Sequence, residues 1–538
     1  MQLFEALFLV AVALAIVRII VGARFAWLRY SVTTGIATLL LLAGLLLEGW
    51  RWQLLPAYVA FGLIVVGTLR DKETKQVWRL AAALPLLLLV GCAAVLAQLM
   101  PIVSLPAPTG PYAVGTFDFS ITDPARIERY APDRQRELYV EVWYPADASS
   151  AQHHPVHSLF HDVYRGQYNQ SSFLLGYLAR VATHSHVAAP VAHTAGGTFP
   201  VVLFNHALDF GFTSQNLSLM EHLASNGYVV FSIAHPYQSA KVTLAGAGTV
   251  LKAAGLPPDL VFPREELPIG LVGSVLDDTG DMRQVSQLEA LLLPLAEDFI
   301  AADAAGRTAI FQQIVQSPGI EPFRQFVTEE TLADFYYYDY ARYNSLVQYW
   351  VEDNQFLVAS LPDLQTPVPG FVESLDPTRL GVIGMSFGGA AAGEFCKIDR
   401  RCTAGVNLDG TQFGRHWNRK LPVPFLMLYH DGHQGGNDHA YLPAAAEFWD
   451  YRIKGSRHTD FTDFVYLWPL LKLNGFSGGI DGWKMMTLLN TVQLDFLDHT
   501  LKGKAFPPAL HAQLPELVIR SAGPVGPLSK VPDPGAAP

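Results

Sequence analysis

Four long apolar runs within the first 103 residues constrain this chain more than any other feature of its sequence. They cover about Ala6–Val21, Tyr30–Leu47, Leu54–Leu69 and Leu80–Val103. A membrane-spanning helix needs about 20 mostly apolar residues, range about 17–25, so the second and fourth runs suffice directly and the other two depend on flanking residues. A signal peptide followed by buried core helices is disfavoured, because the N-terminus lacks a basic stretch. We predict four transmembrane helices in residues 1–104.

Basic residues beside the short connections predict how these helices are oriented. The first and third connections are flanked by Arg18, Arg24, Arg29, Arg70, Lys72, Lys75 and Arg79, whereas the second has only Arg51 and the N-terminal stub has no basic residue. Basic loops remain in the cytoplasm. We therefore expect an integral protein of a bacterial inner or plasma membrane. The chain after Leu105 should then lie on the periplasmic or extracellular side; an odd number of spans would reverse this.

Charge separates the two parts of the chain and limits its partners. Residues 1–103 carry 8 basic and 4 acidic side chains, and the remainder carries 29 basic and 44 acidic ones. No basic face for nucleic acid is implied, and protein partners are not indicated.

In an oxidising compartment Cys396 and Cys402, six residues apart, are candidates for a disulfide; two free thiols in a packed core are the alternative.

Residues 105–521 alternate apolar strands with helices. Continuous apolar runs at 199–204, 228–233, 380–383, 403–408 and 424–429 are typical of strands that are covered on both faces. This pattern predicts an α/β fold with a mostly parallel sheet between helices. Residues 283–360 are mainly helical in pattern and are predicted to be an insertion, and the Pro/Gly-rich residues 522–538 are predicted to be a disordered tail.

A serine motif follows the third of these strands. Gly384-Met385-Ser386-Phe387-Gly388 has the form G-x-S-x-G and is followed by small residues, which is typical of a nucleophile on a tight turn from strand to helix. Gly475-Phe476-Ser477-Gly478-Gly479 has the same form, but it follows no buried strand and is interpreted as a flexible turn. Ser386 is therefore the predicted nucleophile.

The base and its carboxylate are expected later in the chain, because α/β-hydrolases have the order serine, acid, histidine. Asp409 ends the fourth strand, at the sheet edge where ligands bind, and His458 lies beyond the fifth. Position alone leaves Asp431 and Asp438 open as acids, and His430, His433 and His439 open as bases.

Two backbone N–H groups are expected to form the oxyanion hole, from Phe387 after the nucleophile and from Leu208 in the loop after an earlier strand. His206 in that loop is interpreted as a packing residue.

Seven histidines gather between residues 145 and 198: His153, His154, His157, His161, His184, His186 and His193. They contain no H-E-x-x-H and no cysteine, so we expect solvated loop histidines and neither a metal nor a cofactor.

Several of these segments together resemble the platelet-activating-factor acetylhydrolase family, in its plasma and intracellular type II forms, over roughly residues 108–500. The similar segments are Phe199–Leu208, G-M-S-F-G-G-A from Gly384, Leu408-Asp409, and G-S-R-H-T-D-F-T-D-F from Gly455. The resemblance implies a calcium-independent α/β-hydrolase that acts on phospholipids with short or oxidised acyl chains. It also favours His458 as the base. The chain departs from the family at Met385, which replaces a histidine, and at Ala207 and Asp209, which replace glycines.

The expected function is a membrane-anchored serine ester hydrolase that cleaves short or oxidised acyl esters of phospholipids or related lipids. One alternative is hydrolysis of another substrate class on the same fold, such as dienelactone-type, polyester or peptide cleavage. A second is a non-catalytic membrane sensor that binds a lipid.

Overall fold

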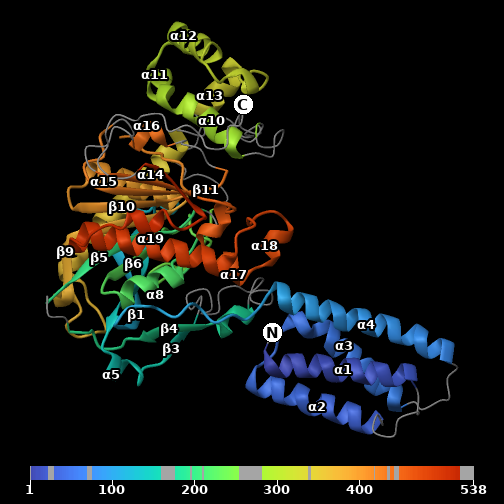
Figure 1. The fold of residues 1–538 in the computed structure, drawn as a ribbon. Coiled ribbons are helices and arrows are strands. Elements are labelled where there is room, and N and C mark those ends of the chain that lie inside the picture. Colours follow the sequence, from blue (N-terminus) through green and yellow to red (C-terminus); the bar gives the residue numbers. More distant parts are fainter. Residues whose placement is uncertain are drawn as a thin grey trace. The chain divides into compact units, whose positions relative to one another are not determined.

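The computed structural model describes residues 2–21, 30–69, 76–158, 176–193, 197–208, 211–253, 275, 282–336, 341–416, 419–432, 437–441 and 447–521. The chain forms two compact units (Figure 1). The helical unit comprises Met1–Leu105, Ser158–Thr183 and Phe464–Gly475, and the sheet unit comprises Pro106–His157, His184–Asp463 and Phe476–Pro538.

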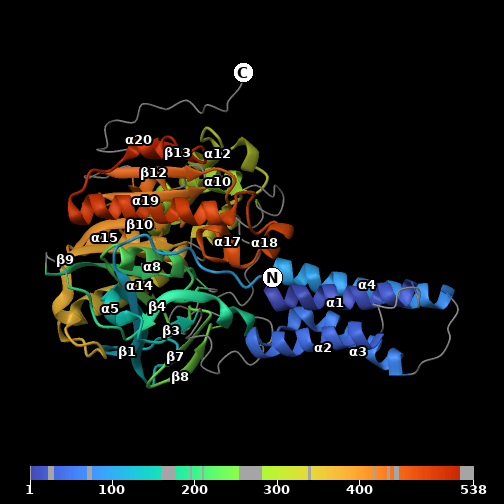
Figure 2. The same ribbon diagram turned by 60° about the horizontal axis from the view of Figure 1, so that its bottom comes forward.

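The helical unit contains α1 (Leu3–Val21), α2 (Tyr30–Leu47), η3 (Trp52–Leu54), α3 (Leu55–Leu69) and α4 (Gln76–Leu99). These helices lie alongside one another in both ribbon views (Figure 2). Small buried side chains, including Ala15, Ala60 and Ala97, are found between them. Small residues allow helix backbones to approach closely, as in membrane bundles.

The helix lengths differ from the sequence prediction as to which apolar runs are long enough to span a membrane. Among the described residues, Leu3–Val21 and Arg79–Leu99 are long and apolar enough to cross a membrane, whereas Val32–Leu47 and Trp52–Gly67 are shorter apolar helices. The first run therefore qualifies and the second does not. Helix α1 begins before its apolar run because the Glu48 carboxylate accepts the backbone N–H groups of Phe4 and Glu5, at 2.8 and 3.0 Å.

Polar contacts join two later segments to the helical unit. Arg51 and Glu5 form a buried ion pair at 2.8 Å, and the Arg51 guanidinium lies 5.4 Å from the ring centre of Tyr177 in η4 (Gly176–Arg180). The indole N–H of Trp468 donates to the Tyr177 hydroxyl at 2.8 Å, and Trp468 lies between α17 (Phe464–Leu467) and α18 (Leu470–Leu473). The helical unit thus extends beyond the residues 1–104 expected from the sequence.

Within the described residues the main sheet has eleven strands, in the order β13-β12-β11-β10-β9-β5-β6-β2-β1-β4-β3. The strands are β1 (Ala113–Ile127), β2 (Gln135–Ala146), β3 (Val156–Ser158), β4 (Ala182–Val187), β5 (Phe199–Asn205), β6 (Val229–Ala234), β9 (Leu375–Met385), β10 (Cys402–Leu408), β11 (Phe425–His430), β12 (Phe448–Ile453) and β13 (Leu517–Ser521). A separate hairpin pairs β7 (Lys241–Leu244) with β8 (Gly248–Leu251).

The centre of the sheet is parallel, as predicted. From β6 through β5, β9, β10 and β11 to β12 every neighbouring pair is parallel, whereas β2 and β13 pair antiparallel at either side. Every residue of β5, β6 and β11 is buried, which explains their continuous apolar sequences. Because parallel strands end at the same edge, residues after β5, β9, β10 and β11 are brought together there.

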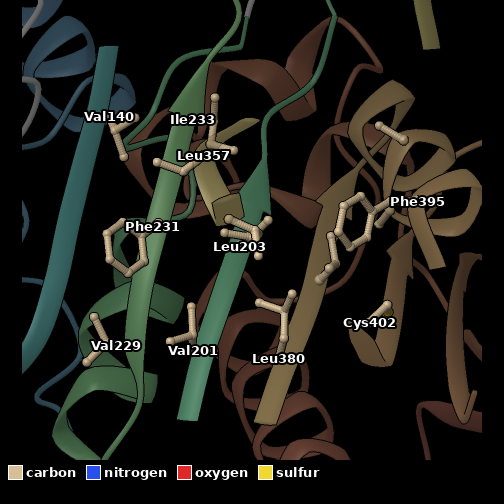
Figure 3. Packing of buried hydrophobic residues seen from close by; sticks show 14 of the residues in the cluster. Val140, Val201, Leu203, Val229, Phe231, Ile233, Leu357, Leu380, Phe395 and Cys402 are labelled. Carbon is tan, nitrogen blue, oxygen red and sulfur yellow. The ribbon is translucent and has the colours of Figure 1, made fainter. Parts of the chain in front are cut away.

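Helices cover both faces of this sheet. Helices α8 (Leu217–Ser225) and α19 (Gly482–Lys502) pack together on one face, and α14 (Ala341–Ser360) and α15 (Phe387–Ile398) on the other. Figure 3 shows the core under the second pair, where Leu203 and Leu380 from adjacent strands lie near Leu357 and Phe395 from the helices. Short helices among the described residues include α5 (Ala148–Ala151), α16 (Asp438–Tyr441) and α20 (Pro508–His511).

The segment predicted as an insertion divides into two parts. Helices α10 (Met282–Leu292), α11 (Ala296–Ala301), α12 (Ala304–Val315) and α13 (Glu329–Asp334) surround an apolar cluster of their own. Helix α14 instead contributes Val347, Trp350 and Leu357 to the main core. It is therefore an integral layer of the sheet unit. The predicted tail, residues 522–538, lies outside the described residues.

Candidate active site

The nucleophile elbow joins β9 to α15. Ser386 has φ 57° and ψ −123°, a strained conformation that L-residues rarely adopt. The turn can form only with glycine beside it, because a Cβ on Gly384 would lie 1.9 Å from the carbonyl oxygen of Gly388. The strained turn holds Ser386 at the carboxyl edge of the parallel strands.

His458 lies between Ser386 and Asp409. Its Nε2 is 3.0 Å from Ser386 Oγ, and its Nδ1 is 2.6 Å from Asp409 Oδ2. Asp409 follows β10 with φ 58° and has a fully buried carboxylate, whereas the imidazole of His458 is 47% exposed. Three side chains that are distant in sequence thus have the contacts of a nucleophile, a base and an orienting acid.

A second imidazole, which the sequence did not assign to this site, contacts the same carboxylate. His430 ends β11, and its Nδ1 is 2.8 Å from Oδ1 and 2.7 Å from Oδ2 of Asp409. Its backbone N–H also donates to Oδ1 at 2.8 Å. Its position at the end of a buried strand was the available signal, but the sequence placed His430 only among rival bases.

The other alternative acids and bases can be placed only where they lie within the described residues. Asp431 accepts the N–H of Gly455 at 2.9 Å and lies 3.8 Å from Arg452. His433 lies outside the described residues, as do the side chains of Asp438 and His439.

The two expected oxyanion donors lie at the ends of neighbouring strands. Phe387 is the first residue of α15, where a backbone N–H has no acceptor within the helix. In the other loop, the N–H of Ala207 donates to Gln215 Oε1 at 3.1 Å, which leaves Leu208 as the next candidate. Asp209 lies outside the described residues.

His206 supports this loop through hydrogen bonds, as expected for a packing residue. The backbone N–H of His235 donates to His206 Nε2 at 3.2 Å, so Nε2 is an acceptor and Nδ1 carries the proton. Nδ1 then donates to the carbonyl of Ala207 at 2.7 Å. Burial, together with the nearby His235, lowers the pKa of His206 to about 3, so the imidazole is neutral at physiological pH.

A buried ionic network that the sequence did not predict supports His206 and the loop. The ring of His235 stacks on Trp350 at 3.9 Å, and its Nδ1 donates to Asp353 at 2.8 Å. Asp353 also accepts two hydrogen bonds from Arg136, at 2.6 and 3.1 Å. Burial lowers the pKa of His235 to about 4, although Asp353 acts in the opposite direction. The network connects β2, β6 and α14 to the oxyanion loop.

The second G-x-S-x-G sequence has a different environment. Its backbone supports the His458 loop: Gly478 N–H donates to Asp460 at 2.8 Å, and Thr459 donates to the carbonyl of Phe476 at 2.5 Å. Ser477 follows the short helix α18, and within the described residues 470–477 no strand or nucleophile turn precedes it.

The histidines between residues 145 and 198 are partly ordered by contacts, contrary to the expectation of solvated side chains. His157 is buried against Glu141 at 3.1 Å, and His184 contacts Glu221 at 3.1 Å. His161 lies outside the described residues. Among the residues that the structure describes, no group of three or more histidine, cysteine or acidic side chains is arranged to hold a metal.

Cys396 near the end of α15 and Cys402 at the start of β10 form a disulfide, with Cα atoms 5.1 Å apart. It closes the short connection between the nucleophile helix and the strand that leads to Asp409.

Comparison with known proteins gives a consistent relationship. The family model for "Platelet-activating factor acetylhydrolase, isoform II" matches residues 98–251 and 361–506, more than half of the chain. The acetylhydrolase of that name from Cavia porcellus is 22% identical over 416 residues, which cover 74% of this chain and 78% of the relative. The one from Bos taurus is 28% identical over 155 residues, covering 27% and 34%.

A solved structure supports the fold. The ferulic acid esterase from Streptomyces cinnamoneus has a TM-score of 0.52 and 20% identity, covering 78% of this chain and 100% of that chain. The α/β-hydrolase architecture expected from the sequence is therefore confirmed. The chain belongs to the platelet-activating factor acetylhydrolase, isoform II, family of serine esterases.

Proposed function

We propose that this enzyme is a membrane-anchored serine hydrolase that cleaves short or oxidised acyl esters of phospholipids or related lipids. The observation that carries the proposal is the arrangement of Ser386, His458 and Asp409, with contacts of 3.0 and 2.6 Å. This spacing fits proton transfer from the serine hydroxyl to the imidazole.

The reaction follows from these contacts. Ser386 Oγ attacks the ester carbonyl as its proton passes to His458 Nε2, and Asp409 stabilises the imidazolium. The N–H groups of Leu208 and Phe387 stabilise the oxyanion, an effect worth about 3–4 kcal/mol per donor in well-studied enzymes. The C–O bond breaks as His458 returns the proton to the leaving alcohol. Water, activated by His458, then hydrolyses the acyl-enzyme to release the carboxylic acid.

The surroundings of the elbow are apolar, which supports an apolar acyl group in the proposed substrate. The Phe387 ring lies 4.9 Å from Trp350 and 5.9 Å from Tyr343, and Tyr343 lies 4.9 Å from Phe413. Trp350 and Phe387 are buried in the core, whereas Tyr343 and Phe413 are partly exposed, and partly exposed rings can provide apolar contact area. Membership of the acetylhydrolase family favours a lipid ester over the alternatives.

Membrane anchoring is supported by the outer surfaces of the four N-terminal helices. Apolar side chains are exposed on each of them, including Leu14, Leu39, Leu63 and Leu88, which are 43–69% exposed. These helices are thus apolar inside and outside, a pattern expected in lipid and unfavourable in water.

The catalytic proposal is tested by labelling the detergent-solubilised full chain with a fluorophosphonate, which reacts with activated serines. We expect wild type and Ser477→Ala to be labelled and Ser386→Ala to be unlabelled. Ser386→Ala should also lose at least about a thousandfold in kcat. Wild-type protein that is folded but unlabelled would favour the lipid-sensor alternative.

The substrate proposal is tested with a panel of short-acyl p-nitrophenyl esters, phospholipids with acetyl or oxidised sn-2 chains, long-chain phospholipids and peptides. We expect the first two classes to be hydrolysed. Cleavage of peptides but not of lipid esters would contradict the proposed substrate class.

A further inference from the structure

Asp409 accepts hydrogen bonds from two imidazoles, and this arrangement extends the proposed function, on which the present inference rests. His458 Nδ1 contacts Oδ2, while His430 contacts both carboxylate oxygens through its ring and Oδ1 through its backbone N–H. An ionised carboxylate only accepts hydrogen bonds, so both imidazoles carry a proton on Nδ1. Neutral His458 therefore has an unprotonated Nε2, as a base for Ser386 requires.

The surroundings of His430 favour a second proton on its ring. The side chain is 6% exposed. Burial acts to lower the pKa of His430, but Asp409, Asp431 and Asp460 together raise it above its ordinary value. Further charged or titratable groups near His430, among the residues that the structure describes, include His458 and, on the adjacent strand β12, Arg452, which lies 3.8 Å from Asp431.

The charge on His430 bears directly on the reaction. The single negative charge of Asp409 stabilises the imidazolium that His458 forms during both acylation and deacylation. When His430 is also protonated, two positive rings share that one charge and repel each other. The His458 imidazolium is then less stable, so His458 is a weaker base.

We propose that His430 is a positioning residue for ester hydrolysis: across the shared Asp409 carboxylate, its positive charge disfavours protonation of His458 and so extends the acid limb of the pH–rate profile toward lower pH. His430 does not touch the substrate in this account. Protonation of His430 and protonation of His458 should therefore be coupled, and loss of the charge on His430 should make His458 easier to protonate.

The test is the pH dependence of kcat/KM for a short-acyl p-nitrophenyl ester with the full chain in detergent. His430→Asn keeps an N–H donor toward Asp409 but cannot become charged. We expect its acid limb to move about one unit toward higher pH, with the alkaline plateau within about threefold of wild type. His430→Gln provides a second uncharged donor if His430→Asn folds poorly.

Two controls separate this effect from general damage. Rates are divided by the concentration of sites that react with the fluorophosphonate, so only competent enzyme is counted. His184→Asn removes another histidine whose pKa a carboxylate, Glu221, raises, but which does not contact Asp409; it should leave the profile unchanged.

A His430→Asn profile that coincides with wild type would overturn the inference, and so would an equal shift in His184→Asn. Either result leaves the proposed function intact, provided that wild type hydrolyses the ester in a Ser386-dependent manner. Absence of that hydrolysis would instead overturn the proposed function.

Discussion

Asp353 accepts hydrogen bonds from Arg136 and His235, and all three side chains are fully buried. The two charges of the Asp353–Arg136 pair were removed from water on folding, which costs several kcal/mol per ion unless each remains paired. Because His235 in turn contacts His206 and Asn205, the ion pair maintains the support of the oxyanion loop.

Removing the negative charge of Asp353 should therefore destabilise the folded protein. Asp353→Asn leaves the Arg136 guanidinium buried with only Glu128 as a carboxylate partner, at 2.7 Å, and we expect the free energy of unfolding to fall by about 3 kcal/mol or more. The measurement is urea unfolding followed by tryptophan fluorescence. The neighbouring Glu352→Gln, which weakens a partly exposed pair with Arg126 at 3.6 Å, should change it by less than about 1 kcal/mol. Equal effects in the two variants would contradict this explanation.

Only some of these residues could be predicted from the sequence, and the reason is physical. Ser386, Asp409 and His458 follow a motif and a fixed chain order, and the structure brings them within hydrogen-bonding distance. The contacts of Asp353 and His430 depend on how β2, β6, β10 and β11 converge in space. No local sequence pattern encodes such convergence.

At the scale of elements, the elbow and the loop at 475–479 show that one sequence pattern can form two structures. A Cβ on Gly388 would lie 2.2 Å from the carbonyl oxygen of Asn205, whereas a Cβ on Gly479, at the equivalent motif position, would have no atom within 4 Å. The close approach of α15 to β5 therefore requires glycine at only one of the two sites.

The two glycines should respond differently to substitution. Gly388→Ala must displace the elbow from β5, and we expect kcat/KM to fall by at least about a hundredfold with a lower melting temperature. Gly479→Ala should keep wild-type activity and stability. Ester hydrolysis and thermal denaturation of the two variants test this pair, and an active Gly388→Ala enzyme would show that the close packing is dispensable.

The central strands were predictable because burial on both faces leaves a continuous apolar run, as in β5 and β6. The place of helix α14 in the fold was harder to predict from the sequence. Its acidic and aromatic residues suggested an insertion, yet Trp350 is fully buried, and Asp353 beside it is paired inside the sheet unit. Charged residues are mostly exposed unless they are paired, so a helix with buried, paired charges resembles a surface helix in its sequence.

At the scale of the whole molecule, the proposed topology makes a prediction about the two sides of the membrane. Alkaline phosphatase, which is active only in an oxidising compartment, should be active when fused after residue 521 and inactive when fused after Lys72 in the basic third connection. The protein should also remain in the membrane fraction after carbonate extraction. The reverse pattern of phosphatase activity would contradict the proposed topology.

The helical unit is assembled from three separate stretches of the chain, and this limits how the enzyme can be shortened. Deleting residues 1–105 to obtain a freely soluble form would strip Ser158–Thr183 and Phe464–Gly475 of the helices that they pack with. The second stretch starts directly after Asp463, whose carboxylate holds the start of α8. Crystallisation or cryo-microscopy of the esterase should therefore begin with the intact polypeptide in a nanodisc.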